Sequence, residues 1–300
     1  MTEFQKKIAG LLPEIELRFE EQMEKHTSFR IGGPVEVMAL PKHAAELSKI
    51  LKVSSLLDVK PVILGAGTNV LAPDAGMQGL VICLKDRFDG MEQLDATTIR
   101  LMAGVTMTRG AVFAANLGLS GLEFAHGIPG TVGGGVYMNA GAYGGEICQV
   151  CKRVDVMDFQ GEIRSFTKEE MGFSYRHSVL EEQEGIVVSA DFELIPRDPQ
   201  LIKEKMKELM AKRSASQPLD KPSAGSAFKR PVGGYAAALI DQAGLKGYQV
   251  GDAAISTKHA GFAVNLGQAT AEDVKQLLQD VSDKVFELSG IRLEPEVRIW

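Results

Sequence analysis

The chain has 300 residues, and its 45% hydrophobic and 24% charged content is that of an ordinary globular protein and argues against disorder. Its 33 basic and 39 acidic residues give a formal net charge of -6, the opposite of what binding to nucleic-acid phosphates requires. The sequence has no run of 18 apolar residues and no apolar block near its amino terminus. We therefore expect neither a membrane span nor a signal peptide, and we predict a cytoplasmic protein.

Hydrophobic periodicity predicts alternating helices and strands in the first half of the chain. Apolar residues three and four apart predict an amphipathic helical segment over residues 1–25, broken near Pro13. The elements expected after it are a helix at 42–57, strands at 61–64, 79–84 and 98–103, and a helix at 106–116 that ends at Gly118.

The second half contains the signals of a hinge and a second unit. The stretch 214–231 is rich in Pro, Ser and Gly, which is typical of a loop between units. Before it we expect strands at 153–159 and 162–166 joined by a hairpin at Gln160 and Gly161, a strand at 186–195 and a charged helix at 198–213. After it we expect a helix at 234–243, strands near 247–251 and at 261–266, a helix opened by a capping box between Thr270 and Asp273, and a final strand at 291–299.

Glycine is the anomaly of the composition, because 32 glycines are about 11% of the chain against a usual ~7%. One group is the loop 65–69, which follows a strand and would let a phosphate approach the backbone closely. Val70 and Pro73 stand where a Rossmann motif needs its third glycine and its helix. A nucleotide bound in another manner and a plain glycine turn are both open for this loop alone.

A denser group of glycines lies between residues 118 and 145, where ten of 28 positions are glycine. The interleaved Ile128, Val132 and Tyr137 indicate burial, whereas a flexible linker would be polar. Backbone that lies flat against a large planar cofactor with a pyrophosphate explains the pattern. The alternative is a seam where small residues let helices pack closely.

Three further motifs have both a chemical and a structural interpretation. Cys148 and Cys151 have the spacing of a redox pair or half a zinc site, but no second motif accompanies them, which favours packed thiols. Arg176 offers a planar fork for a carboxylate, although a surface ion pair would use it equally well. Ser226 and Lys229 match the Ser-x-x-Lys core of penicillin-binding acyl enzymes, whose other two motifs are missing. The neighbouring cations would favour proton donation by Ser226, and a capping serine in a polar loop is the alternative.

Taken in order, these segments resemble the UDP-N-acetylenolpyruvoylglucosamine reductases, flavoenzymes of bacterial peptidoglycan precursor synthesis. The resemblance covers about residues 26–299. It rests on the motifs at 27–33, 64–69, 127–145, 174–176, 222–231, 258–262 and 293–297.

The resemblance implies an α+β fold with an FAD-binding domain of the vanillyl-alcohol-oxidase type. That domain would cover residues 26–197 in two α+β subdomains, about 26–86 and 87–197, after an amino-terminal helical segment at 1–25. A smaller α+β substrate domain would follow at 198–300. The sequence has no insertion after Tyr175, so it resembles the type of the family that lacks an extra tyrosine-bearing loop.

The resemblance further implies that NADPH reduces UDP-N-acetylglucosamine enolpyruvate to UDP-N-acetylmuramate through non-covalent FAD, in a monomer without nucleic-acid or membrane partners. A different flavoenzyme on the same scaffold, an oxidase that passes electrons to oxygen, is the main alternative. In the family pattern Arg176 binds and polarises the enolpyruvyl carboxylate, Ser226 donates the proton, and Glu296 stabilises the enol intermediate.

The cofactor and substrate residues also follow from the family motifs. The expected FAD-binding residues are Leu64, Gly65, Ala66, Gly67, Thr68, Asn69, Val70, Gly127, Ile128, Pro129, Gly130, Gly133, Gly134, Asn139, Gly141, Ala142 and Ile186. The expected substrate-binding residues are Tyr175, Lys229, Arg230, His259 and Asn265. Two departures from the pattern, His126 before Gly127 and the small side chains at 261–263, leave the shape of the pocket open.

Overall fold

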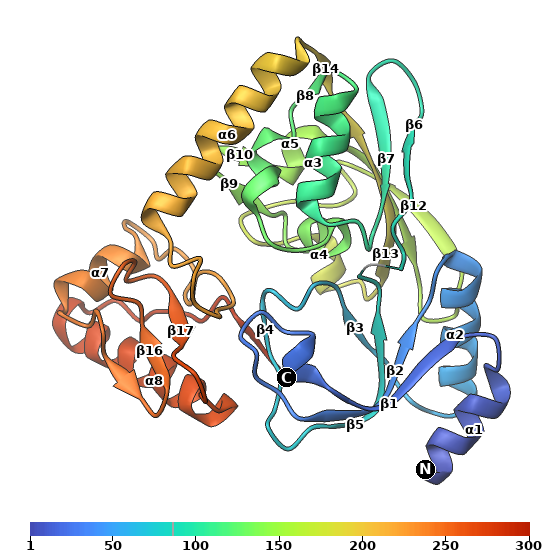
Figure 1. Cartoon of the computed structure of the whole chain (residues 1–300), viewed down its shortest axis with the longest axis horizontal. Helices are drawn as coiled ribbons and strands as arrows, with labels where there is room; N and C mark the ends of the chain where they lie inside the picture. Colours follow the sequence, from blue (N-terminus) through green and yellow to red (C-terminus); the bar gives the residue numbers. More distant parts are fainter. Residues whose placement is uncertain (86) are drawn as a thin grey trace. The chain divides into compact units, whose positions relative to one another are not determined.

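The computed structural model describes residues 1–85 and 87–300, and the chain divides into two units, each built from separate stretches of sequence (Figure 1). Unit 1 consists of Met1–Phe19, Glu36–Ala66 and Gly79–Lys212, and unit 2 of Glu20–Val35, Gly67–Gln78 and Arg213–Trp300. The sequence predicts that a second unit follows the hinge-like loop at 214–231. Unit 2 contains that carboxy-terminal part and, in addition, residues 20–35 and 67–78.

The larger sheet of unit 1 is antiparallel and has five strands in the order β12-β11-β13-β7-β6. Its strands are β6 (Met91–Gln93), β7 (Thr98–Met102), β11 (Cys151–Met157), β12 (Ile163–Thr167) and β13 (Ile186–Glu193). Leu101, Val154 and Phe192 are buried in the core of the unit, and the central strand β13 is buried along its whole length from Ile186 to Phe192.

A second sheet has four strands in the order β1-β2-β5-β3. Its strands are β1 (Glu16–Gln22), β2 (Pro34–Leu40), β3 (Val62–Leu64) and β5 (Met77–Cys83), of which β3 and β5 are parallel. Leu47, Ile50 and Leu51 of the helix α2 (Ala44–Leu56) are buried in the same core.

The remaining elements of unit 1 are short, apart from α1, α3 and α6. They are α1 (Glu3–Leu11), α3 (Met107–Asn116), β8 (Leu119–Ser120), η2 (Glu123–Gly127), α4 (Val132–Tyr137), β9 (Gly141–Ala142), β10 (Gly145–Glu146), α5 (Ile147–Val150), η3 (Val179–Glu181), β14 (Ile195–Pro196) and α6 (Pro199–Ser216), whose last residues belong to unit 2. In the part of the chain that the structure covers, no helix combines the length and apolar character that a membrane crossing needs.

Unit 2 is organised around the helix α8 (Ala271–Ser289) and a small antiparallel sheet. One face of α8 is buried in the core of this unit, and a capping box between Thr270 and Asp273 begins the helix. The other elements are η1 (Met23–Lys25), β4 (Val70–Leu71), α7 (Ala236–Gln242), β15 (Gln249–Val250), β16 (Ala253–Ile255), β17 (Ala263–Asn265) and β18 (Arg298–Ile299).

Most of the predicted elements are confirmed to within a few residues. The confirmed ones are α2, α3, α6, α7, α8, β3, β5, β7, β11, β12, β13, β15 and β17.

The turn between β11 and β12 is longer than the two residues expected. Asp158 accepts hydrogen bonds from the N–H groups of Gln160 and Glu162, and Gly161 adopts a φ of 86°.

The predicted helical segment over residues 1–25 is wrong in its second half, where the chain forms β1. Ile15 and Phe19 fit a helical spacing, but Ile15, Leu17 and Phe19 also alternate as a strand does, and all three pack on the core of unit 1. Two periods thus fit the same short run, and sheet pairing decided between them.

The predicted strand at 291–299 is also shorter than expected, because only Arg298 and Ile299 form a ladder, with β4. Pro295 makes an isolated bridge to Phe228. Since proline has no N–H to donate, a regular ladder cannot run through this position.

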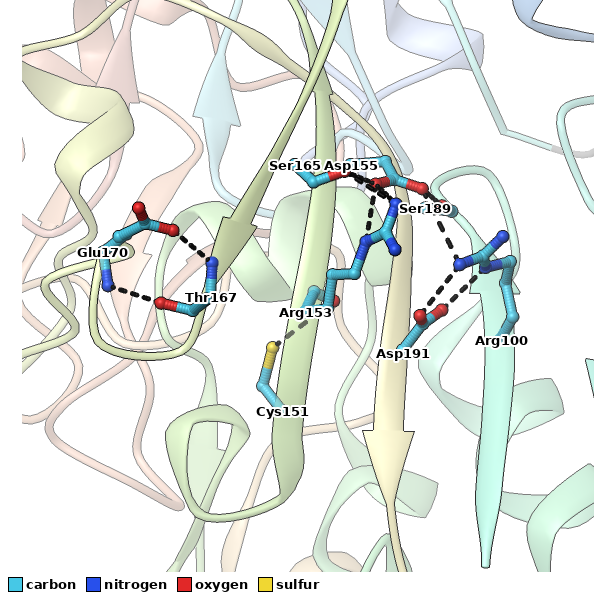
Figure 2. A network of polar contacts seen from close by, with 9 residues as sticks. All are labelled: Arg100, Cys151, Arg153, Asp155, Ser165, Thr167, Glu170, Ser189 and Asp191. Carbon is cyan, nitrogen blue, oxygen red and sulfur yellow. Dashed lines mark hydrogen bonds and ion pairs between the residues drawn. The ribbon is translucent and has the colours of Figure 1, made fainter. Parts of the chain in front are cut away.

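A row of charged side chains crosses the five-stranded sheet of unit 1 (Figure 2). Arg100 on β7 lies opposite Asp191 on β13 and donates two hydrogen bonds to its carboxylate, at 2.7 and 2.8 Å. Asp155 on β11 accepts hydrogen bonds from Ser165, at 2.7 Å, and from Arg153, at 2.9 Å. Strand pairing places Arg100 opposite Asp191 and Asp155 opposite Ser165, whereas Arg153 precedes Asp155 by two residues on the same strand.

The network shifts the pKa values of Arg100 and Asp155. Hydrogen bonding to Asp191 raises the pKa of Arg100. Burial raises the pKa of the Asp155 carboxyl, but hydrogen bonds from Ser165 and Arg153 outweigh it and hold this pKa below its ordinary value. Asp155 therefore contributes stability at neutral pH that is lost as the pH falls through its depressed pKa.

We expect Asp191→Ala to lower the free energy of unfolding by about 3 kcal/mol, because it removes the acceptor of both Arg100 hydrogen bonds and leaves only Asp155, at 3.8 Å, as a carboxylate partner in this network. Urea denaturation at pH 7 measures the loss. The matched control is Glu193→Ala, which removes an exposed carboxylate of the same strand that pairs with Lys152, and we expect a much smaller effect. Equal losses in the two variants would contradict the role given to the Arg100–Asp191 pair.

Candidate functional site

The two glycine-rich segments meet in unit 1. Gly65 follows the buried Leu64 at the end of β3, and a Cβ at position 65 would lie only 2.5 Å from Oγ1 of Thr131. Thr131 is 2% exposed and begins α4, inside the second segment. The sequence predicted that both segments serve one site, and the fold places the first residue of the 65–69 loop against Thr131 of the second segment.

The short helix α4 is held by hydrogen bonds to the loop that follows β7. The N–H of Val132 donates to the carbonyl of Val105 at 2.8 Å, and the N–H of Gly133 to that of Ala103 at 2.9 Å. The N–H of Gly134 donates to Oγ1 of Thr131 at 3.4 Å. The first N–H groups of α4 therefore donate their hydrogen bonds to acceptors within the protein.

Packing within unit 1 explains many of the glycines between residues 118 and 145. A Cβ at Gly133 would lie 2.9 Å from Cβ of Ala103, and one at Gly135 would lie 2.8 Å from Sδ of Met107. A Cβ at Gly145 would lie 2.5 Å from the ring of Phe124. Gly134 differs, because a Cβ there would lie 3.7 Å from its nearest neighbour, Oγ1 of Thr131, which is an ordinary contact distance. The alternative of a small-residue seam therefore accounts for part of the pattern.

The other expected cofactor residues of unit 1 are distributed over the same region. Gly127 ends η2, Gly130 has a φ of 141°, and Gly141 and Ala142 form β9, whereas Ile186 begins β13 with 2% exposure. Thr131 was not predicted as a site residue. Its signal is a threonine before a helix, but the glycines that follow it hide the helix.

Asn139 is 1% exposed, and its side chain is fully engaged with the protein. Its Nδ2 donates to the carbonyl of Ser174 at 2.9 Å and to Glu146 at 3.2 Å, and its Oδ1 accepts from the N–H of Cys148 at 2.9 Å. These bonds leave only the main chain of Asn139 for the cofactor contact that the family motif suggests.

His126, which departs from the family pattern, provides an unsatisfied polar atom beside this segment. Its Nδ1 is buried and has no hydrogen-bond partner among the residues that the structure describes. A buried nitrogen without a partner costs free energy, so it points to a group that the protein itself does not supply.

Arg176 lies in a tight turn of unit 1 and has a φ of 55°, a conformation that few residues other than glycine adopt. Ser174 and His177 close the turn with two backbone hydrogen bonds of 3.2 and 3.3 Å. The Arg176 guanidinium lies 5.2 Å from the ring centre of Tyr175, which is 46% exposed. The turn thus presents a cation and an aromatic ring together.

In unit 2 the end of the 65–69 loop is joined to the carboxy terminus. A Cβ at Gly67, whose φ is 63°, would lie 2.0 Å from the carbonyl oxygen of His26, so only glycine fits there. Asn69 donates from Nδ2 to the carbonyl of Glu296 at 3.2 Å and accepts at its own carbonyl from the N–H of Arg298 at 2.9 Å. Val70 and Leu71 then pair with β18.

Ser226 and Glu296 lie on adjacent extended segments of unit 2. The N–H of Glu296 donates to the carbonyl of Ala227 at 2.9 Å, and Ser226 forms an isolated bridge with Phe262 on its other side. Ser226 is exposed, whereas Ala227 is completely buried. The fold thus brings together two of the three predicted catalytic residues, which are far apart in the sequence, while Arg176 belongs to unit 1.

The two cations after Ser226 have other partners. Lys229 forms an ion pair with Glu294 at 3.6 Å, and the Arg230 guanidinium lies 4.5 Å from the ring centre of Tyr235. The expected activation of Ser226 by these cations stays a prediction. A Ser-x-x-Lys acyl enzyme would likewise need Lys229 directed at Ser226.

His259 is a half-buried neutral imidazole in this unit. Its Nδ1 accepts a hydrogen bond from the N–H of Gly261 at 3.1 Å, and its ring packs edge-on against Phe262. Burial lowers the pKa of His259 below its ordinary value. With Nδ1 as an acceptor, the neutral ring carries its proton on Nε2, where it can donate to a substrate oxygen.

Asn265 is 2% exposed and holds the fold of unit 2. Its Nδ2 donates to the carbonyl of Phe29 at 3.0 Å, and its Oδ1 accepts from the N–H groups of Gly267 and Ala269. These bonds engage the amide within the fold, and the contact of Asn265 with substrate stays a prediction.

Cys148 and Cys151 are free thiols. Burial raises the pKa of Cys148, and burial raises the pKa of Cys151 to about 12, which disfavours the reactive thiolate. Among the residues described, no group of three or more His, Cys, Asp or Glu side chains is placed to hold a metal ion.

Two family models match the chain. A model described as an FAD binding domain covers residues 35–167, and one for the C-terminal domain of UDP-N-acetylenolpyruvoylglucosamine reductase covers residues 217–300.

Individual proteins are similar over nearly the whole chain. UDP-N-acetylenolpyruvoylglucosamine reductase of Agathobacter rectalis is 45% identical, with 99% of this chain and 98% of the relative covered. The protein of the same name from Streptococcus pneumoniae is 41% identical, with 98% and 97% covered. The crystal structure of the reductase from Thermus caldophilus has a TM-score of 0.80 at 36% identity, with 96% of this chain and 99% of that chain covered.

The fold is shared more widely. A chitooligosaccharide oxidase structure has a TM-score of 0.50 at 14% identity and covers 96% of this chain and 60% of its own. The expected fold class, an α+β flavoprotein of the vanillyl-alcohol-oxidase type, is confirmed.

We expect Gly133→Ala to destabilise the protein by about 1–3 kcal/mol without added cofactor, because the new methyl group would overlap Ala103. The adjacent Gly134→Ala is the matched control. It has room for a methyl group in the same helix, and alanine favours a helix over glycine, so we expect no loss of stability. Urea denaturation of both proteins tests this, and an equal loss in both would contradict the packing explanation.

We expect the stability of the protein to fall at acidic pH in part because of His259. The unfolded chain binds a proton as the pH drops through about 6.5, whereas the folded imidazole stays neutral to lower pH. His259→Asn removes this difference and should flatten the dependence of the free energy of unfolding on pH between 7.5 and 5.5. An unchanged slope in the variant would show that other groups cause it.

Proposed function

The chain belongs to the UDP-N-acetylenolpyruvoylglucosamine reductase family, and from this premise we propose that it reduces UDP-N-acetylglucosamine enolpyruvate to UDP-N-acetylmuramate. It is an oxidoreductase that uses FAD and takes its electrons from NADPH, in peptidoglycan precursor synthesis. The geometric observation that best supports the proposal is that Ser226 and Glu296, far apart in the sequence, lie on adjacent segments.

The reaction adds a hydride and a proton across the enol ether double bond, while NADPH becomes NADP⁺. FAD, when bound, supplies the relay of two electrons between NADPH and the sugar nucleotide. The hydride adds to the terminal vinyl carbon, and negative charge then develops toward the carboxylate of the enolpyruvyl group. Residues that stabilise this charge supply the main catalytic effect.

The proposed roles of the three catalytic residues follow from their chemistry. Arg176 binds the enolpyruvyl carboxylate through its planar fork and stabilises the developing charge. The hydroxyl of Ser226 delivers the proton to the carbon beside the carboxylate and so completes the lactyl ether. Glu296 supports the enol intermediate from the segment next to Ser226. The exposed position of Ser226 in unit 2 suits a group that must reach a substrate.

We assign FAD to the backbone of the two glycine-rich segments. The contact of Gly65 with Thr131, the open position beside Gly134 and the unpartnered Nδ1 of His126 support this assignment. The remaining residues proposed to contact FAD come from the family motifs: Leu64, Ala66, Gly67, Thr68, Asn69, Val70, Gly127, Ile128, Pro129, Gly130, Gly133, the main chain of Asn139, Gly141, Ala142 and Ile186.

For the sugar nucleotide we propose contacts with Tyr175, Lys229, Arg230 and Nε2 of His259. Residues 26–197 would then provide the FAD-binding domain and residues 198–300 most of the substrate domain. We further propose a cytoplasmic monomer whose product supports cell-wall growth, and hence cell shape and division.

We expect the purified protein to bind FAD, NADPH to bleach the flavin absorbance, and the enolpyruvyl sugar nucleotide to restore it in the absence of oxygen. Ser226→Ala and Glu296→Gln should keep the NADPH half-reaction and slow the substrate half-reaction by ~100- to 10,000-fold, because each removes a group needed only for that step. Anaerobic stopped-flow absorbance measures both rates.

Glu287→Gln is the matched control for Glu296→Gln. It changes an exposed carboxylate near the end of α8, in the same unit, to an amide, and both half-reactions should stay near their parental rates. A colourless protein that takes up no FAD would refute the proposal. Rapid reoxidation by air without sugar nucleotide would indicate an oxidase, and equal losses in both half-reactions would mean that Ser226 and Glu296 serve the fold.

A further inference from the structure

The turn that carries Arg176 is held from outside at both ends. Two residues before Arg176, the carbonyl of Ser174 accepts a hydrogen bond from Nδ2 of Asn139 at 2.9 Å. Two residues after it, Oγ of Ser178 donates to the carbonyl of Tyr137 at 2.7 Å. Both bonds reach the same short stretch, residues 137–139 at the carboxyl end of α4.

These holding bonds are buried and fixed by their surroundings. Ser178 is completely buried, and Asn139 is 1% exposed. Asn139 is itself oriented by its hydrogen bonds with the N–H of Cys148 and the carboxylate of Glu146. Its φ of 42° is one that asparagine tolerates better than most residues. A side chain restrained in this way can position the segment that it binds.

The conformation of Arg176 explains why the turn needs such support. A non-glycine residue with a φ of 55° persists only where the surrounding structure enforces it, and such residues gather at functional sites. The backbone bonds between Ser174 and His177 close the turn, but they do not fix it relative to any other element. Asn139 and Ser178 provide that attachment, within unit 1.

We propose that Asn139 and Ser178 are positioning residues that hold the Arg176 turn against the end of α4, so that the guanidinium is preorganised for the carboxylate of the substrate. The inference rests on the proposed role of Arg176. The glycine-rich segment would then have a second role besides binding FAD. Its residues 137–139, at the end of α4, would fix the position of the Arg176 guanidinium relative to the segment assigned to FAD.

The test replaces each positioning side chain and measures the two half-reactions separately. Asn139→Gly removes the amide and keeps a residue that accepts a positive φ, and Ser178→Ala removes only the hydroxyl. We expect each variant to slow the substrate half-reaction by about 10- to 100-fold, since a misplacement of about 1 Å has costs of this order. For Ser178→Ala the dissociation constant of FAD and the rate of reduction by NADPH should change by less than about twofold.

The matched control for Ser178→Ala is Ser54→Ala. Ser54 is a buried serine of α2 that also donates to a carbonyl, that of Leu51 at 2.9 Å, and its loss should leave both half-reactions unchanged. Spectral titration of the oxidised holoenzyme with the enolpyruvyl sugar nucleotide should show weaker binding for Asn139→Gly and Ser178→Ala but not for Ser54→Ala.

A double-mutant cycle with Arg176→Ala decides whether the effect passes through Arg176. In the Arg176→Ala background, Ser178→Ala should slow the substrate half-reaction by less than about twofold more. Full additivity, or equal losses in both half-reactions, would overturn the positioning role and leave a structural one. If Arg176→Ala alone does not slow the substrate half-reaction, the proposed role of Arg176 fails as well, which separates the two failures. Should Asn139→Gly not fold, Ser178→Ala completes the cycle by itself.

Discussion

The missing side chain at Gly65 is the constraint on which the first part of the site depends. Because no Cβ stands there, the chain leaving β3 can lie against Thr131 at the start of α4. Glycines of the second segment are constrained in the same way, because Ala103, Met107 and Phe124 fill the space that side chains at those positions would need. Close backbone packing within the protein therefore comes first, and a cofactor can use only the positions that remain open.

In unit 2 the corresponding constraint is a set of backbone hydrogen bonds between irregular extended segments. Ala227 bonds to Gly261 on one side and to Glu296 on the other, so the segment of Ser226 runs between two others. Asn69 adds a side-chain bond to the carbonyl of Glu296. Such bonds fix the main chain of the segment that we propose to be catalytic.

Electrostatics in the two units serve different purposes. The Arg100–Asp191 pair is satisfied on the sheet of unit 1 and stabilises the register of its strands. His259 in unit 2 is kept neutral by burial, and so it offers a hydrogen-bond donor rather than a charge. Burial also raises the pKa of Cys148 and Cys151, which disfavours the reactive thiolate at both positions.

The sequence by itself determined the family, the fold class and most helices and strands, because hydrophobic periods and short motifs are local properties of the chain. Only the tertiary structure decided that residues 16–22 form a strand, that several glycines serve packing, and that the amide of Asn265 is occupied by the fold. It also revealed the contact of Thr131 with Gly65 and the hydrogen bond from Ser178 to Tyr137. Each of these depends on a partner far away in the chain, and a local pattern contains no information about which distant atom will fill a space or accept a hydrogen bond.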